Sequence, residues 1–149
     1  MEIKIIRISA ADTYPVRHAE LRKGRPLSSC AFVGDDLEST IHIGAYNKDM
    51  LIGVASFMTA PFSEQTNIAA MQLRGMAVLA GYHRRGVGAK MLQAGEQLLD
   101  DQNIFLLWMN ARIAAIPFYR SSGYLISGSE FDIPEVGAHF KMWKRLSES

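Results

Sequence analysis

Hydrophobic residues in the first quarter of the chain change from a strand-like to a helix-like spacing. Isoleucines within residues 3–8 nearly alternate with polar residues, as in a half-buried strand. The pair Asp12-Thr13 ahead of Pro15 predicts the cap and first turn of a helix that continues to Leu21. Glycine, proline and serine accumulate within residues 22–36, which predicts a loop or an irregular helical connection.

The next segments favour a hairpin followed by a third strand. Strand-forming residues dominate 37–46 and 51–61, and the polar cluster 47–49 between them is typical of a turn. Residues 68–78 continue the strand pattern but contain Gly75. A glycine inside a strand often marks a bulge or a close approach of the backbone to another group.

The second half of the chain alternates helix and strand again. Within 86–101 the apolar residues recur every three or four positions, which predicts one buried helix face. The short apolar run 104–109 predicts a strand covered on both faces near the middle of a sheet. A helix over 111–122, stopped by a glycine, precedes two closing strands at 126–131 and 138–146.

Length and composition fit a single globular unit. The chain has 149 residues, of which 48% are hydrophobic and 21% charged. A chain of this size removes roughly 70% of its unfolded surface from water, so it needs no disulfide or metal to fold. Since no repeat, low-complexity tract or linker interrupts the pattern, we expect one mixed α and β domain over residues 1–149.

Charge and cysteine content narrow the functional classes. Lysine and arginine number 16 against 15 aspartate and glutamate, and this net charge of +1 disfavours binding to nucleic acid or an acidic membrane surface. Cys30 is alone and forms no internal disulfide, which fits a reducing compartment. Charges interrupt the N-terminal apolar residues, and the longest apolar run, 104–109, is too short to span a bilayer. We therefore expect a cytoplasmic protein that binds neither nucleic acid nor membrane.

The sharpest local motif is the octapeptide from His83 to Lys90, which contains two glycines and two arginines before a predicted helix. The first backbone amides of a helix lack intrahelical partners and attract anions, and Gly86 and Gly88 leave room for a phosphate to approach them. The three-glycine dinucleotide fingerprint and the Walker loop are both absent. The octapeptide alone also permits close helix packing with solvated arginines.

Further segments on either side of the octapeptide add to this signal. In chain order they are Gly75-Met76-Ala77-Val78, Arg84-Arg85-Gly86-Val87-Gly88, Asn110, Ala115-Ile116-Pro117-Phe118-Tyr119 and Gly123-Tyr124. Together they resemble the GNAT superfamily of acyl-CoA-dependent N-acyltransferases. The phosphate motif of that family is Gln or Arg, any two residues, Gly, any one residue, and then Gly or Ala; here His83 stands at the Gln or Arg position. The resemblance is strong over 68–124 and implies a GNAT-like mixed, mostly antiparallel, splayed sheet of about seven strands flanked by about four helices.

The resemblance implies an acyl-CoA site along these segments. In the family, a strand that matches residues 76–78 pairs through its backbone with the pantetheine arm, and an amide beside Gly75 points at the thioester oxygen. The amides of 84–89 hold the pyrophosphate, with arginine and lysine side chains adding charge. The expected cofactor-binding residues are Met76, Ala77, Val78, His83, Arg84, Arg85, Gly86, Val87, Gly88, Ala89, Lys90, Asn110, Ala115 and Phe118.

Tyr119 is the expected general acid, because the resemblance places it beside the sulfur of the departing CoA. A phenol with a pKa of about 10 is protonated at neutral pH and can protonate a thiolate. The same ring could instead pack with Phe118 as part of the core.

Other assignments remain open at the level of sequence. Asn110 either binds the pantetheine or neighbouring backbone or caps the following helix. A general base is needed to deprotonate an amine, and His42, Glu64 and His139 are candidates, although a structural role is the commoner one for a histidine. The four histidines are scattered and the single cysteine has no companion, so no metal site is expected.

These residues predict an N-acetyltransferase that uses acetyl-CoA as co-substrate. Direct attack in a ternary complex would move the acetyl group to a primary amine of a small molecule or peptide, and no motif identifies that acceptor. The alternatives are a non-catalytic acyl-CoA-binding or sensing module and a nucleotide-phosphate binder outside the family. Family members often form dimers, so a homodimer is one expectation.

Overall fold

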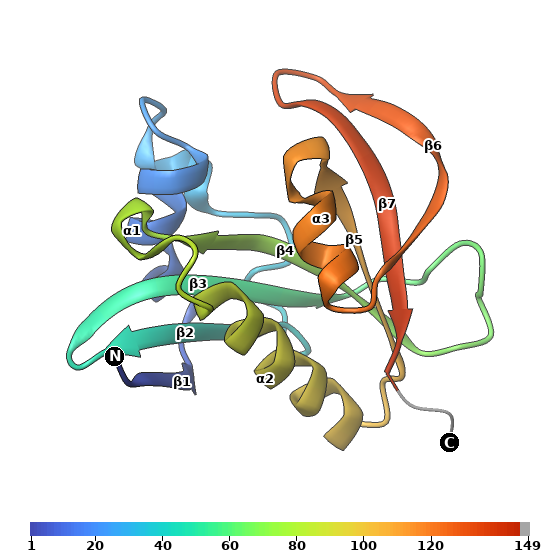
Figure 1. The fold of residues 1–149 in the computed structure, drawn as a ribbon, viewed down its shortest axis with the longest axis horizontal. Coiled ribbons are helices and arrows are strands. Elements are labelled where there is room, and N and C mark those ends of the chain that lie inside the picture. Colours follow the sequence, from blue (N-terminus) through green and yellow to red (C-terminus); the bar gives the residue numbers. More distant parts are fainter. Residues whose placement is uncertain (147–149) are drawn as a thin grey trace. The chain divides into compact units, whose positions relative to one another are not determined.

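The computed structural model describes residues 1–146 and contains seven strands and three α-helices over that range (Figure 1). Three short 3-10 helices connect these elements. In chain order the elements are β1 (Ile3–Arg7), α1 (Ala10–Leu21), η1 (Leu27–Cys30), β2 (Ile41–Asn47), β3 (Met50–Thr59), β4 (Ala70–Val78), η2 (Ala80–Tyr82), α2 (Val87–Asp101), β5 (Leu106–Arg112), η3 (Ile113–Ala115), α3 (Ile116–Ser121), β6 (Leu125–Ile133) and β7 (Gly137–Arg145).

The strands are hydrogen-bonded in the order β1-β2-β3-β4-β5-β7-β6. The ladders β1–β2, β2–β3, β5–β7 and β6–β7 are antiparallel, whereas β4 and β5 pair in parallel from Ala70 opposite Leu106 to Gln72 opposite Trp108. The expected mixed, mostly antiparallel sheet is therefore confirmed. The α-helices of residues 1–146 number three rather than about four, because 22–36 holds only the 3-10 turn η1.

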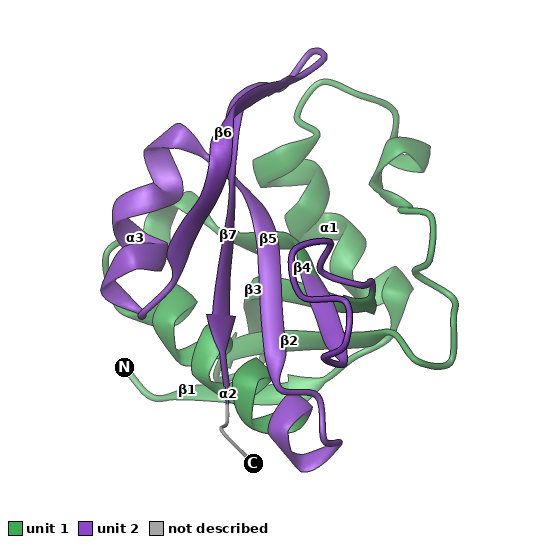
Figure 2. Cartoon of the chain, turned by 90° about the vertical axis from the view of Figure 1, so that its right-hand side faces the viewer, with its two compact units in different colours: residues 1–59, 73–98 green, residues 60–72, 99–149 purple. Residues whose placement is uncertain are grey.

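The chain divides into two compact units (Figure 2). Unit 1 comprises Met1–Thr59 and Leu73–Leu98, and unit 2 comprises Ala60–Gln72 and the chain from Leu99 onward. Strand β4 contributes its first three residues to unit 2 and the remainder to unit 1. Unit 1 thus contains the end of β4 and the start of α2, and unit 2 contains α3 with the last three strands.

In unit 1, strand β3 is buried along residues 52–58 because a helix lies against each of its faces. Val54 belongs to one buried cluster with Val16 of α1. A Cβ atom at Gly53 would lie 3.0 Å from the terminal methyl group of Met91 in α2. Because neighbouring residues of a strand point to opposite faces, α1 and α2 cover opposite faces of β3. This double cover explains the nearly continuous apolar sequence of the strand.

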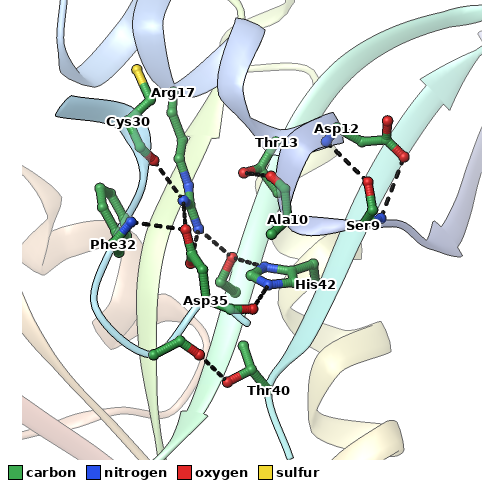
Figure 3. Close-up of polar contacts among 12 residues, drawn as sticks. Ser9, Ala10, Asp12, Thr13, Arg17, Cys30, Phe32, Asp35, Thr40 and His42 are labelled. Carbon is green, nitrogen blue, oxygen red and sulfur yellow. Dashed lines mark hydrogen bonds and ion pairs between the residues drawn. The ribbon is translucent and has the colours of Figure 1, made fainter. Parts of the chain in front are cut away.

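Helix α1 begins earlier than the sequence predicts. The Ser9 hydroxyl accepts a hydrogen bond from the Asp12 amide at 3.2 Å, and the Asp12 carboxylate accepts one from the Ser9 amide at 3.3 Å (Figure 3). This reciprocal pair is a capping box, so Ser9 is the N-cap and Asp12 lies in the first turn. Pro15 consequently stands inside the helix rather than at its start.

The predicted bounds of two other elements also shift. Residues 37–40 form a turn instead of opening β2, because the Thr40 amide bonds to the Leu37 carbonyl at 3.0 Å. The helix predicted over 111–122 starts later, since its first two residues extend β5 as far as Arg112, which pairs with His139 of β7. Strand pairing in the sheet therefore overrides the local preference for helix at this point.

In unit 2, helix α3 ends in a Schellman motif. The Tyr124 amide bonds to the Tyr119 carbonyl at 3.1 Å, and the Gly123 amide bonds to the Arg120 carbonyl at 3.0 Å. Gly123 has a φ angle of +94°, which a residue with a side chain rarely adopts. The rings of Tyr119 and Tyr124 meet edge-on, with centroids 6.0 Å apart, and add the apolar contact that accompanies this motif.

Helix α2 and strand β3 approach so closely that only glycine fits at position 95. A Cβ atom on Gly95 would lie 2.1 Å from the Phe57 ring, which is fully buried. An alanine in an ordinary helix interior is more stabilising than glycine by about 1 kcal/mol. Here we expect Gly95→Ala to lower the free energy of unfolding by about 1–3 kcal/mol through overpacking, measured by urea denaturation.

The exposed residue Gln93 of the same helix offers a matched control, and Gln93→Ala should leave stability nearly unchanged. Adding Phe57→Leu to Gly95→Ala should recover part of the lost stability, because leucine lacks the ring that the added methyl group would meet. A stabilised single variant would contradict this account of the contact.

Candidate active site

The turn from β4 into α2 uses two residues with left-handed backbone conformation. Arg84 has a φ angle of +61° and Gly86 one of +81°. Val87, the first residue of α2, is buried and anchors the start of the helix. The amide of Lys90 bonds to the Gly86 carbonyl at 3.1 Å, so the helical bonding begins at this glycine.

The start of α2 is open to an anionic ligand. A Cβ atom on Gly86 would meet no atom within 4 Å, and Arg84, Arg85 and Lys90 are all exposed. The amides of the first helical turn have no intrahelical acceptor and lie at the positive end of the helix dipole. These residues therefore fit a pyrophosphate group, with open space, backbone donors and positive side chains at one place.

His83 supports this turn through protein contacts. Its Nε2 atom donates a hydrogen bond to the Val78 carbonyl at 2.6 Å and lies 3.7 Å from a carboxylate oxygen of Glu20. The other Glu20 oxygen accepts a bond from the Ala80 amide at 3.3 Å. The side chain that replaces the Gln or Arg of the family motif thus ties the end of β4 and η2 to α1.

Strand β4 carries three more of the unit 1 residues expected at the site, and Gly88 and Ala89 lie in the first turn of α2. Ala77 is buried in the cluster with Val16 and Val54, while Met76 and Val78 are half-buried. Gly75 has a φ angle of +61°, which confirms the predicted irregularity of the strand. This glycine lies inside β4, three residues before the strand ends at Val78.

A buried polar network lies beside Gly75, and the sequence analysis did not predict it. The Arg17 side chain is completely buried and forms a bidentate ion pair with Asp35, at 2.7 and 3.0 Å. Arg17 also donates to the Cys30 carbonyl at 2.8 Å and to the Ser56 hydroxyl at 2.9 Å (Figure 3). A bidentate pair of this kind is the strongest polar contact available to a buried arginine.

His42, one of the three candidates for the general base, belongs to this network. Its Nε2 atom lies 2.9 Å from the Asp35 carbonyl, which accepts only, so this nitrogen carries the proton. Its Nδ1 atom lies 2.7 Å from the Ser56 hydroxyl and accepts its hydrogen bond. Both ring nitrogens of His42 therefore take part in hydrogen bonds within the protein. Arg17 donates to the Ser56 hydroxyl, and this hydroxyl in turn donates to His42.

Asp35 is ionised because its partners outweigh its burial. Burial alone raises the pKa of a carboxyl group. Hydrogen bonds from the Arg17 side chain and the Phe32 amide, together with the positive charge of Arg17, lower the pKa of Asp35 below its usual value of 3.8. The ion pair therefore persists throughout the neutral pH range.

Unit 2 holds the expected acid and the remaining predicted contacts. Tyr119 is 9% exposed, and burial raises its pKa to about 12. Its ring lies 5.1 Å from that of Phe118. The ring therefore packs in the core and the hydroxyl keeps its proton, although the raised pKa makes the phenol a weaker acid. Ala115 is the N-cap residue of α3 and is half-buried.

Asn110 does not cap a helix. It lies inside β5, opposite Lys141 of β7, and the strand continues to Arg112. Arg112 is the N-cap residue of η3 and Ala115 that of α3. The capping alternative for Asn110 is therefore wrong, and the acyl-CoA contact stays a prediction.

The two other base candidates have structural partners in unit 2. His139 is buried, donates from Nδ1 to the Gly137 carbonyl at 2.7 Å and packs against the Phe131 ring. Glu64 is exposed, and a hydrogen bond from Ser63 and the charge of Lys141 lower its pKa. A lower pKa makes Glu64 a weaker base.

Residues 1–146 contain no group of three or more histidine, cysteine, aspartate or glutamate side chains arranged to hold a metal ion. None of the helices within the same range has both the length and the apolar character needed to cross a bilayer.

Comparison with known proteins agrees with this geometry. A sequence model of the acetyltransferase (GNAT) family matches residues 5–124, and the chain therefore belongs to this family of N-acetyltransferase enzymes. It is 33% identical over 147 residues to YitI, an uncharacterized N-acetyltransferase of Bacillus subtilis strain 168, with 99% of each chain covered. The resemblance found in the sequence is thus confirmed.

Solved structures share the fold at low sequence identity. The chain superposes with a TM-score of 0.78 on an aminoglycoside 6'-N-acetyltransferase solved with coenzyme A, at 13% identity over 98% of each chain. It also matches the ribosomal-protein-S18-alanine N-acetyltransferase of Escherichia coli with a TM-score of 0.75, at 18% identity over 99% of this chain and 96% of that one.

The Arg17–Asp35 pair should control stability at low pH. Asp35→Asn leaves a buried arginine without its carboxylate and should lower the free energy of unfolding by about 3–5 kcal/mol near neutral pH. The pKa of Asp35 is lower in the folded than in the unfolded chain, so its contribution is complete above pH ~4 and is lost as the pH falls through the folded pKa. Urea denaturation at several pH values should therefore show that the free energy of unfolding falls more steeply toward acid pH in the unmodified protein than in Asp35→Asn.

Asp36→Asn serves as the control, because Asp36 is the exposed neighbour of Asp35. It should retain the stability and the acid dependence of the unmodified protein. Equal acid slopes for the unmodified protein and Asp35→Asn would disprove the role given to this carboxylate.

Proposed function

We propose that this chain transfers an acetyl group from acetyl-CoA to a primary amine by direct attack in a ternary complex. The observation that carries the proposal is the open, positively charged start of α2 at the end of β4, in a chain that belongs to the GNAT family. Most of the catalysis would come from positioning the amine against the thioester. A cytoplasmic location, a single domain and a homodimer remain predictions.

Residues of this chain would bind each part of acetyl-CoA, the donor of the acetyl group. The amides of 84–89 would bind the pyrophosphate, with Arg84, Arg85 and Lys90 adding charge, and His83 would hold the turn in place. The backbone of 76–78 would bind the pantetheine arm as an added strand. By family resemblance, Asn110, Ala115 and Phe118 complete the contacts with acyl-CoA.

Tyr119 would supply the proton for the leaving group. Acetyl-CoA provides an activated acyl group whose carbon–sulfur bond breaks as the new carbon–nitrogen bond forms. With a pKa raised to about 12, the phenol is protonated at every pH at which the enzyme would work. Its hydroxyl proton can pass to the departing sulfur, the amine's own proton leaves to solvent, and a proton from solvent then restores the phenol. The side chains named above as base candidates all have structural partners, so we infer that water removes that proton.

Acetyl-CoA should raise the melting temperature of the protein, and a free-thiol assay with pooled primary amines should detect CoA release. A thermal shift without CoA release would instead support the acyl-CoA sensor, and a shift with ATP that CoA does not reproduce would support a nucleotide binder. No shift with acetyl-CoA would disprove the proposed donor.

Gly86→Val should weaken acetyl-CoA binding about tenfold or more, because its side chain would occupy the open space over the first turn of α2. Isothermal titration calorimetry gives the dissociation constant. Gly128→Val is the matched control, since Gly128 has a φ angle of +79° and equally open surroundings, so the backbone strain is similar. Equal affinities of the two variants for acetyl-CoA would show that its phosphates do not bind at this turn.

Tyr119→Phe should lower kcat about 100-fold while the affinity for acetyl-CoA stays unchanged. Tyr124→Phe is the control, because that ring takes part in the same Schellman contact. In the unmodified enzyme, ionisation of Tyr119 should cause no loss of kcat below pH ~11, as its pKa is about 12. Normal turnover by Tyr119→Phe would exclude it as the acid.

A further inference from the structure

Three arginine side chains surround one phenylalanine ring in unit 1. The guanidinium carbon lies 3.9 Å from the Phe32 ring centroid for Arg17, 5.2 Å for Arg22 and 5.1 Å for Arg74. The three arginines come from the first helix, from the residue that follows it, and from β4. We call these three side chains and Phe32 the arginine–phenylalanine cluster.

The cluster is held rigidly against β4. The Phe32 amide donates to an Asp35 carboxylate oxygen at 2.8 Å, so the buried Arg17–Asp35 pair fixes the loop that carries the ring (Figure 3). A Cβ atom at Gly75 would lie 2.8 Å from the Phe32 ring and 3.2 Å from Nε of Arg17. Because Gly75 has no side chain, the Phe32 ring and the Arg17 side chain can both pack against β4 next to Met76.

Arg17 and Arg74, the two arginines nearest to Phe32, differ in how their charges are balanced. Asp35 neutralises Arg17 through both of its oxygens. Arg74 is half-buried, and within residues 1–146 no carboxylate lies at ion-pair distance from it. The Arg17 Nε atom is buried and has no hydrogen-bond partner in the same part of the chain. A half-buried guanidinium without a carboxylate partner favours an oxyanion, which accepts hydrogen bonds from arginine at fixed geometry.

We propose that the arginine–phenylalanine cluster binds an oxyanion of the acceptor, so that the substrate is a primary amine that also carries a carboxylate or a phosphate. This inference rests on the proposed function, because the cluster lies one residue from the strand segment assigned to the thioester end of acyl-CoA. Arg74 holds the oxyanion by a charge-assisted hydrogen bond, and Phe32 provides an apolar surface for the carbon chain between the two ends. Cationic acceptors such as diamines are disfavoured, since their second charge meets Arg74.

Amines of similar length test this inference. The series is 4-aminobutyrate, 3-aminopropyl phosphate, n-butylamine and 1,4-diaminobutane, assayed by CoA release at saturating acetyl-CoA. We expect kcat/KM for one or both oxyanionic amines to exceed that for n-butylamine about tenfold or more, and the diamine to be the poorest substrate. The first two compounds distinguish a carboxylate from a phosphate as the group recognised.

The variant Arg74→Gln tests whether the preference for oxyanionic amines comes from the cluster. It should raise KM for the preferred oxyanionic amine about tenfold and leave KM for n-butylamine and kcat unchanged, whereas Arg74→Lys should restore part of the preference. Arg7→Gln, at an exposed arginine of β1, should behave as the unmodified enzyme. An equal loss with every amine would overturn the inference, as would n-butylamine or the diamine being the best substrate.

Calorimetry separates this inference from the proposed function. The two oxyanionic amines and n-butylamine are titrated into the protein with and without saturating CoA, which requires no turnover. Tighter binding of an oxyanionic amine, lost in Arg74→Gln, would support the cluster as an acceptor site even if no acetyl transfer were detected. Equal binding of all three amines would reject the cluster even if acetyl transfer to another amine were confirmed.

Discussion

The ion pair between Arg17 and Asp35 is the interaction on which unit 1 depends most. A buried arginine is strongly destabilising without a carboxylate, and here the pair also satisfies the Cys30 carbonyl, the Ser56 hydroxyl and the Phe32 amide. These partners come from η1, from the connection after it and from β3, whereas Arg17 itself lies in α1. One buried charge pair therefore fixes an irregular segment that has few regular hydrogen bonds of its own.

The position of Phe32 follows from this pair, and so does the character of the surface beside β4. A loop of residues 22–36 with only a short 3-10 helix would otherwise have many conformations. Because the pair holds the loop against Gly75, the aromatic ring and the arginines around it stay at one place on the strand. Specificity for an acceptor can then be built on a loop without the loss of precision that a mobile segment would bring.

Elements with strong periodicity could be predicted from the sequence, and so could the turn before α2. The helix at 86–101 and the β2–β3 hairpin need only local patterns, and the family motif carries the turn. The Arg17 network could not be predicted, because Arg17 and Asp35 are separated by 17 residues that include the loop after α1, and both look like ordinary surface residues in sequence. The bounds of β5 depended on pairing with β7, a contact that local patterns do not contain.

The burial of Cys30 has a practical consequence for work on this enzyme. Its side chain is fully buried at the end of η1, and it is the only cysteine of the chain. Reagents that detect the thiol of released CoA therefore have no accessible protein thiol to react with while the fold is intact. When the segment held by Arg17 opens, the same reagents would label Cys30, so this thiol is a built-in probe of local unfolding beside β4.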